Sequence, residues 1–222
     1  LPRAIELLNA SLARLEKDPS RAMESSILHR KLARAELMTG RKLIDGGNSP
    51  EARRHFEFSS AAMEKAVAFL RHPRNDGTFQ LPDVLQEYSH VLVNCNRVDE
   101  ALHCLDEAIE MLVKTDKSAG SVWSRDTTRL GNALLTKLSF LKELLPETDR
   151  IPLLDQLIEI GHRHSDRNQN IAALFSEKAQ VFRERGESSN ARKFYLLSAD
   201  MFHELGMTTA ALREEEMARA CQ

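Results

Sequence analysis

The chain has 222 residues, of which 42% are hydrophobic and 5% aromatic, enough apolar material for a core but few of the side chains that strands favour. Its 31 lysines and arginines nearly balance its 33 aspartates and glutamates, for a formal net charge of −2. This balance provides no global positive field for nucleic acid or for an anionic membrane, and no apolar run approaches the roughly 18 residues that a membrane span requires.

Ten amphipathic segments follow one another along the chain, each with apolar residues at helical spacing. Ser49-Pro50-Glu51 is a strong helix start, with a capping serine, a proline at the first helical position and an acid in the first turn. The predicted helices cover residues 1–16, 22–44, 49–71, 81–94, 98–113, 122–145, 149–164, 170–185, 188–205 and 208–220. The sequence therefore predicts an all-α chain of about ten helices, with loops at 72–79 and 115–121.

The clearest pair of helices lies between Phe175 and Ser198. Bulky, small and turn residues recur there at fixed offsets, at Phe175, Ala179, Phe182, Gly186, Ala191, Tyr195 and Ser198. They form one stripe on each helix, where small residues let the two axes approach and aromatic rings fill the seam. One such hairpin cannot bury its stripes alone, so the spacing predicts further copies.

Other segments repeat this spacing in whole or in part. The copies are Gly40, Leu43, Gly47, Ala52, Phe56 and Ser59; Leu85, Leu92, Asn96, Ala101, Leu105 and Ala108; Leu138, Leu145, Asp149, Leu154, Ile158 and Gly161; Tyr195, Ala199, Phe202, Gly206, Ala211 and Ala218; and a half-copy at Ala4, Leu8 and Ser11. The motif resembles the tetratricopeptide repeat (TPR), with a longer and less regular period than its usual 34 or so residues.

The resemblance implies a right-handed superhelix of antiparallel helix hairpins, and we interpret residues 1–222 as a single TPR-like array. Lys178 stands where the family has a leucine. We therefore expect its truncation to cost much less stability than that of Phe182, which belongs to the packed stripe.

No grouping of residues indicates catalysis, a metal or a cofactor. His162 and His164 are two residues apart, so they point in different directions on a helix. The histidines and cysteines between His90 and Cys104 lack the short paired spacing of zinc sites. We therefore predict no catalytic residues, no metal site and no cofactor.

The resemblance also implies a binding groove along the first helices of successive hairpins. The residues expected to face it are Leu37, Arg41, Gln86, His90, Glu143, Gln180 and Arg183. These are not the lysine, asparagine and arginine residues with which TPR domains hold chaperone C-termini, so that class of partner is not favoured.

The preferred hypothesis for function is a non-catalytic scaffold or adaptor that binds an extended peptide or an amphipathic helix of another protein. One alternative is a regulatory sensor that closes on a peptide or small ligand. Another is a structural helical spacer within a large enzyme or complex subunit.

The cysteines and the first residue of the chain indicate where the protein is located and whether it is part of a longer one. Cys95, Cys104 and Cys221 are odd in number and have no paired spacing, which argues for a reducing compartment and thus for an intracellular protein, cytoplasmic or nuclear. The chain begins at Leu1 inside a repeat unit, so we expect it to be a segment of a longer protein. An exposed array end of this kind could also promote self-association.

Overall fold

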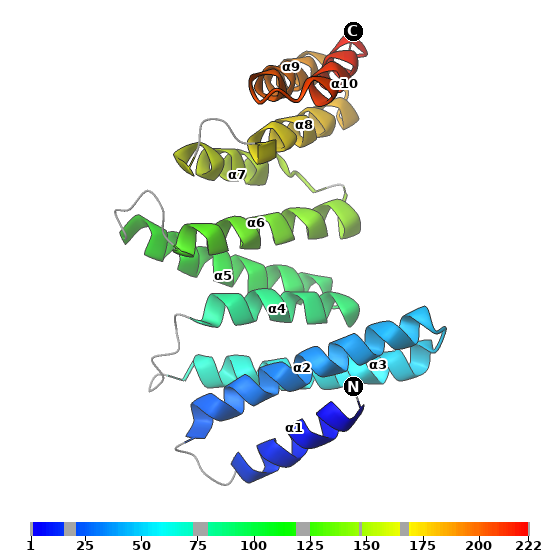
Figure 1. The fold of residues 1–222 in the computed structure, drawn as a ribbon, viewed down its shortest axis with the longest axis vertical. Coiled ribbons are helices and arrows are strands. Elements are labelled where there is room, and N and C mark those ends of the chain that lie inside the picture. Colours follow the sequence, from blue (N-terminus) through cyan, green and yellow to red (C-terminus); the bar gives the residue numbers. More distant parts are fainter. Residues whose placement is uncertain are drawn as a thin grey trace. The chain divides into compact units, whose positions relative to one another are not determined.

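The structure is a computed structural model that describes residues 2–15, 21–72, 80–118, 125–146, 148–164 and 169–221 (Figure 1). Its helices are α1 (Pro2–Leu15), α2 (Ala22–Asp45), α3 (Ser49–Leu70), α4 (Leu81–Asn94), α5 (Val98–Ser118), α6 (Arg125–Leu144), α7 (Ile151–His164), α8 (Gln169–Glu184), α9 (Ser188–Glu204) and α10 (Thr208–Arg219). The described residues contain ten helices and no strand, which confirms the predicted all-α fold. None of these helices combines the length and the apolar character needed to cross a bilayer.

Two predicted loops fall largely outside the described residues. Residues 73–79 and 119–124 are not described. The part of the second loop that is described, 115–118, continues helix α5 instead of forming a turn.

The chain divides into two compact units, Leu1–Lys114 and Thr115–Gln222. In the first unit α1 packs against α2, α2 against α3, and α3 against α4. In the second unit α6, α7, α8, α9 and α10 pack in the same consecutive manner. Packing between sequence neighbours is typical of a solenoid-like fold. The interpretation that a single array continues through both units stays a prediction.

Four of the helix hairpins share one turn. Each contains a residue with a left-handed backbone: Gly47 (φ 79°), Asn96 (59°), Gly186 (75°) or Gly206 (73°). The amide of the next residue donates to a carbonyl in the last turn of the preceding helix, at 2.8–2.9 Å. In all four the next helix begins two residues after the left-handed residue. Glycine adopts this conformation at little cost, and asparagine tolerates it better than most residues, so these positions end one helix and set the angle of the next.

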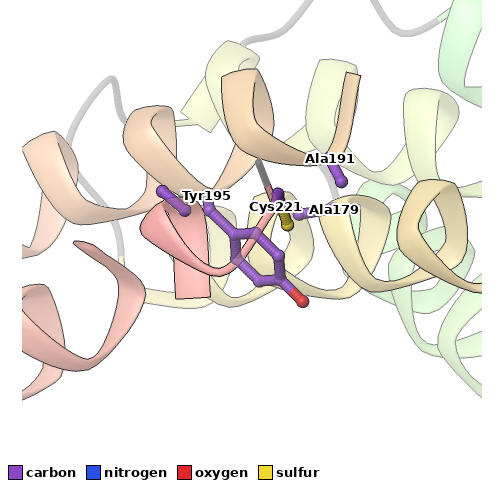
Figure 2. Close-up of a cluster of buried hydrophobic side chains, with 5 residues drawn as sticks. Ala179, Ala191, Tyr195 and Cys221 are labelled. Carbon is purple, nitrogen blue, oxygen red and sulfur yellow. The ribbon is translucent and has the colours of Figure 1, made fainter. Parts of the chain in front are cut away.

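The predicted seam between α8 and α9 is present. Ala179 and Ala191 are fully buried, and Tyr195 packs against them together with Cys221 (Figure 2). Ser198 Oγ donates to the Ala172 carbonyl at 2.9 Å, from a fully buried position.

The α2–α3 hairpin has the same hydroxyl bond at its own seam. Ser59 Oγ donates to the Ala33 carbonyl at 2.7 Å, and in both hairpins the donor and acceptor are 26 residues apart. The two hairpins are therefore copies in their internal contacts as well as in their spacing.

Lys178 is more buried than the repeat pattern suggests. Its exposed fraction is 7%, and its ammonium pairs with Asp155 while lying 4.2 Å from the centre of the Phe194 ring. The aliphatic stem is covered while the charged head reaches a more exposed carboxylate. This burial argues against the expectation that truncating Lys178 costs much less stability than truncating Phe182, and the comparison of the two costs stays a prediction.

The two phenylalanines of the same stripe lie less deeply than predicted. Phe175 and Phe182 are half-buried, and both stack on Phe194, with ring centres 6.1 Å and 5.4 Å apart. They form a partly exposed aromatic layer over the buried seam.

The half-copy in α1 also differs from its prediction. Ala4 and Ser11 are exposed, whereas Leu12 and Leu15 are buried. α1 therefore turns a different stripe toward α2 than the repeat alignment proposes.

Candidate binding site between α2 and α4

A pocket of about 290 Å³ lies within the first unit, between α2 and α4 with α3 beneath. Its lining consists of Ala33, Arg34, Leu37 and Arg41 from α2, Met63 from α3, and Glu87, His90 and Val91 from α4. Arg34, Leu37 and Arg41 share one face of α2 because they are three and four residues apart. The floor is apolar and the rim is charged, and the volume is near the lower end for ligand pockets, roughly 300 Å³.

Three of the residues predicted from sequence meet in this pocket. Leu37 and Arg41 come from α2 and His90 from α4. Gln86, the fourth predicted residue of this unit, is half-buried one turn before His90, and its carbonyl accepts a hydrogen bond from Ser89 Oγ at 2.7 Å.

The remaining predicted residues belong to the second unit. Glu143 is exposed on α6 and accepts a hydrogen bond from Ser139 Oγ at 3.1 Å. Gln180 on α8 donates to Glu184 at 3.0 Å, and the exposed Arg183 places its Nη1 3.9 Å from the sulfur of Met217. Their role in binding stays a prediction.

A carboxylate shared by two arginines spans the pocket. Glu87 accepts from Arg30 Nε at 2.7 Å and from Arg34 Nε at 3.1 Å, and its other oxygen accepts from Nη2 of both. Sequence reasoning missed Arg30, Arg34 and Glu87. Their spacings contain a signal, because Arg30 and Arg34 are four residues apart and Glu87 lies three before His90, but the pairing across 53 and 57 residues does not follow from spacing.

The pocket shifts two pKa values downward for different reasons. Burial alone would raise the pKa of Glu87, but the hydrogen bonds and charges of Arg30 and Arg34 outweigh it and hold that pKa below its ordinary value. Burial, aided by the Arg41 guanidinium and opposed by Glu87, lowers the pKa of His90. Near pH 7 the site therefore contains an ionised Glu87 and a neutral His90.

Arg41 is the pocket cation whose charge is not balanced by an acidic partner within the described part of the chain. It is exposed, and it makes no ion pair with any of the residues that the structure describes. Since Glu87 is already shared between two guanidinium groups, the rim has more positive charge than negative.

A second hollow, in the other unit, has no such excess of positive charge among the residues described around it. It measures about 470 Å³ and lies among the end of α6, the start of α7 and the end of α8. Each of its cations has an acidic partner, in the pairs Lys142–Glu177, Arg150–Glu184 and Arg185–Asp149. Its charges are compensated internally, so it offers less to a charged ligand than the α2–α4 pocket does.

No protein-family model matches the sequence, and no curated protein sequence matches it. Among solved structures, the chain is similar to the crystal structure of BtubC (BKLC) from P. vanneervenii, with a TM-score of 0.55 and 14% identity over 99% of this chain and 87% of that one. Two weaker similarities are to the apo form of the quorum sensor NprR from B. thuringiensis (TM-score 0.37, 12% identity, 97% of this chain and 72% of that one) and to the DHF58 filament (0.27, 14%, 100% and 90%). At these identities the similarity to BtubC concerns the fold alone.

Proposed function

We propose that this chain is a TPR-like helical array that works as a non-catalytic scaffold and binds a segment of a partner protein. The observation that carries the proposal is the α2–α4 pocket, where an apolar floor lies beside Arg41, a cation that makes no ion pair with the described residues. An extended peptide or an amphipathic helix could place one side chain on this floor and a polar group at the rim.

The cysteines support an intracellular location for such a scaffold. Cys95, Cys104 and Cys221 are all free thiols. Burial raises the pKa of Cys104 to about 11, so it is an unreactive packed residue at neutral pH. We propose a reducing compartment, cytoplasmic or nuclear, on this basis.

The test is affinity capture from cell extract with matched charge reversals on one helix. Arg41→Glu changes the pocket rim, whereas Lys42→Glu makes the same charge change at the next, exposed position of α2, outside the pocket lining. Both should change the free energy of unfolding by only about 0.5 kcal/mol, as is usual at surface sites. A like charge facing a partner can cost several kcal/mol, so Arg41→Glu should reduce capture of specific proteins about tenfold or more.

The two variants together decide the proposal. Capture that falls with Arg41→Glu and stays within about twofold with Lys42→Glu would support binding at the pocket. Equal capture by both variants and the parent would remove the pocket from the binding surface.

A further inference from the structure

The hydrogen bonds of Glu87 resemble those that an acidic ligand would receive from this rim. Its two carboxylate oxygens accept four hydrogen bonds, two from Arg30 and two from Arg34. Paired donation from a guanidinium group is the arrangement with which arginine holds a carboxylate of any origin, internal or external. The single carboxylate of Glu87 is therefore shared by two arginines, each of which has the donors to bind a separate carboxylate.

The two arginines hold Glu87 unequally. Arg30 has a side chain that is 26% exposed, donates through Nε at 2.7 Å and does not line the pocket. Arg34 is 58% exposed, donates through Nε at 3.1 Å and lines the pocket. An exposed ion pair is worth little because water and salt screen it. Arg34 is therefore the member of the cluster that can change partners.

The other charges around the cluster favour an exchange. The charge of Asp83, on the same helix as Glu87, also raises the pKa of Arg30, so Arg30 has a second acidic group that helps to compensate it. Arg41 adds to the rim that Arg34 lines a cation that makes no ion pair with the described residues. The ligand that fits has a carboxylate for these two arginines and apolar groups for Leu37, Met63 and Val91. Two rim cations over an apolar floor are too few for the phosphate contacts of a nucleic acid.

We propose that Glu87 occupies an anion site of the pocket in the free protein, and that an acidic segment of the partner replaces it on Arg34 while Arg30 retains Glu87. This inference rests on the proposed function. Glu87 then acts as an internal competitor, so the affinity of the site depends on how firmly Arg30 holds this carboxylate.

The experiment measures binding of a fluorescent nine-residue peptide, a threefold repeat of leucine-glutamate-glutamate, by anisotropy at low ionic strength and at about 150 mM salt. Its counterpart with glutamine in place of glutamate tests the need for the carboxylates. Glu87→Gln frees Arg34 and should tighten binding about three- to tenfold, the range expected when one partly exposed ion pair no longer competes. Glu110→Gln removes the same charge from an exposed site on α5 and should change binding by less than about twofold.

Two more variants distinguish the exchange of Glu87 for a ligand carboxylate on Arg34 from a general effect of the net charge near the pocket. Arg30→Gln leaves Glu87 to Arg34 alone and should weaken binding about threefold, although Arg30 does not line the pocket. Arg34→Gln combined with Glu87→Gln should abolish the gain seen with Glu87→Gln alone. A melting curve for each variant confirms that it is folded.

Several results would overturn the inference. These are equal effects of Glu87→Gln and Glu110→Gln, a gain that persists without Arg34, or tighter binding of the glutamine peptide. Preferential binding of a phosphoserine peptide over the glutamate peptide would replace the acidic segment by a phosphorylated one. If the glutamate peptide fails to bind while Arg41→Glu still abolishes partner capture, the exchange is wrong and the scaffold function stands. If capture is also independent of Arg41, the proposed function is wrong as well.

Discussion

α2 and α3 pack tightly together at Gly40. A Cβ atom added at this position would lie 2.5 Å from Cε1 and 2.7 Å from Cδ1 of Phe56, and 3.1 Å from the carbonyl oxygen of Ala52. Phe56 is 6% exposed and Ala52 is fully buried, so neither can move without shifting α3. Gly131, in α6, is the matched control because nothing lies within 4 Å of its added Cβ.

The expected magnitudes follow from two opposing effects. Replacing glycine by alanine within a helix stabilises it by up to about 1 kcal/mol at both sites. At Gly40 this gain meets an overpacking cost of about 1–3 kcal/mol. Gly131→Ala should therefore be more stable than the parent, Gly40→Ala should be less stable, and their free energies of unfolding should differ by about 1–3 kcal/mol.

Urea unfolding followed by far-ultraviolet circular dichroism measures this difference, provided that the slope with urea concentration is the same in both variants. Adding Phe56→Leu to Gly40→Ala tests the cause, because a smaller, more adaptable side chain should recover part of the loss. If Gly40→Ala is as stable as Gly131→Ala, the two helices are not as close as the structure places them.

Three further predictions address the second seam, the buried lysine and the pocket histidine. Ala191→Leu should overpack the α8–α9 seam and cost about 1–3 kcal/mol by urea unfolding, and an unchanged midpoint would contradict the assigned stripe. Lys178→Ala should cost about 1–2 kcal/mol because it removes the stem and the ammonium from the Phe194 ring, whereas Lys178→Met should retain most of the stability in the same assay; equal losses would contradict stem packing. Because the pKa of His90 is lowered in the folded chain, the unfolded chain binds this proton more readily, and the free energy of unfolding should fall as the pH drops from 7 through the ordinary histidine range near 6.5. His90→Asn should remove that part of the pH dependence, and identical profiles for variant and parent would contradict the shift.

The helices and their turns could be predicted from sequence because their causes are local. A residue such as Gly47 or Asn96 determines a turn through its own backbone, and helical periodicity shows which face is apolar. Burial depth is not local. Phe182 lies on the correct face and is still half-buried, because its depth depends on what the neighbouring helix places above it.

The pocket was predictable only in part for a related reason. Leu37, Arg41 and His90 follow from the direction of a helix face, so stepping along the repeats identified them. The carboxylate of Glu87 reaches Arg30 and Arg34 across more than fifty residues, and that contact depends on the spacing of α2 and α4 in three dimensions. One-dimensional spacing therefore identified three of the eight residues that line the candidate site, but not the ion pairs that govern its charge.

The degeneracy of the repeats has a physical explanation in two equivalent pairs. In the α2–α3 hairpin, His55 Nδ1 lies 2.5 Å from Glu36 Oε2, and in the α8–α9 hairpin the residues at the corresponding positions, Phe175 and Phe194, stack instead. Both pairs connect residues 19 apart, so the backbone holds the two positions together while the contact is polar in one hairpin and aromatic in the other. The turn residue and the small residues that let the two helices pack closely recur in both hairpins, because few residue types can occupy those positions. The seam beside them accepts any pair that fills the space and satisfies its own hydrogen bonds. Repeats built this way retain a common fold while their sequences diverge, in keeping with the similarity to BtubC in fold at 14% identity.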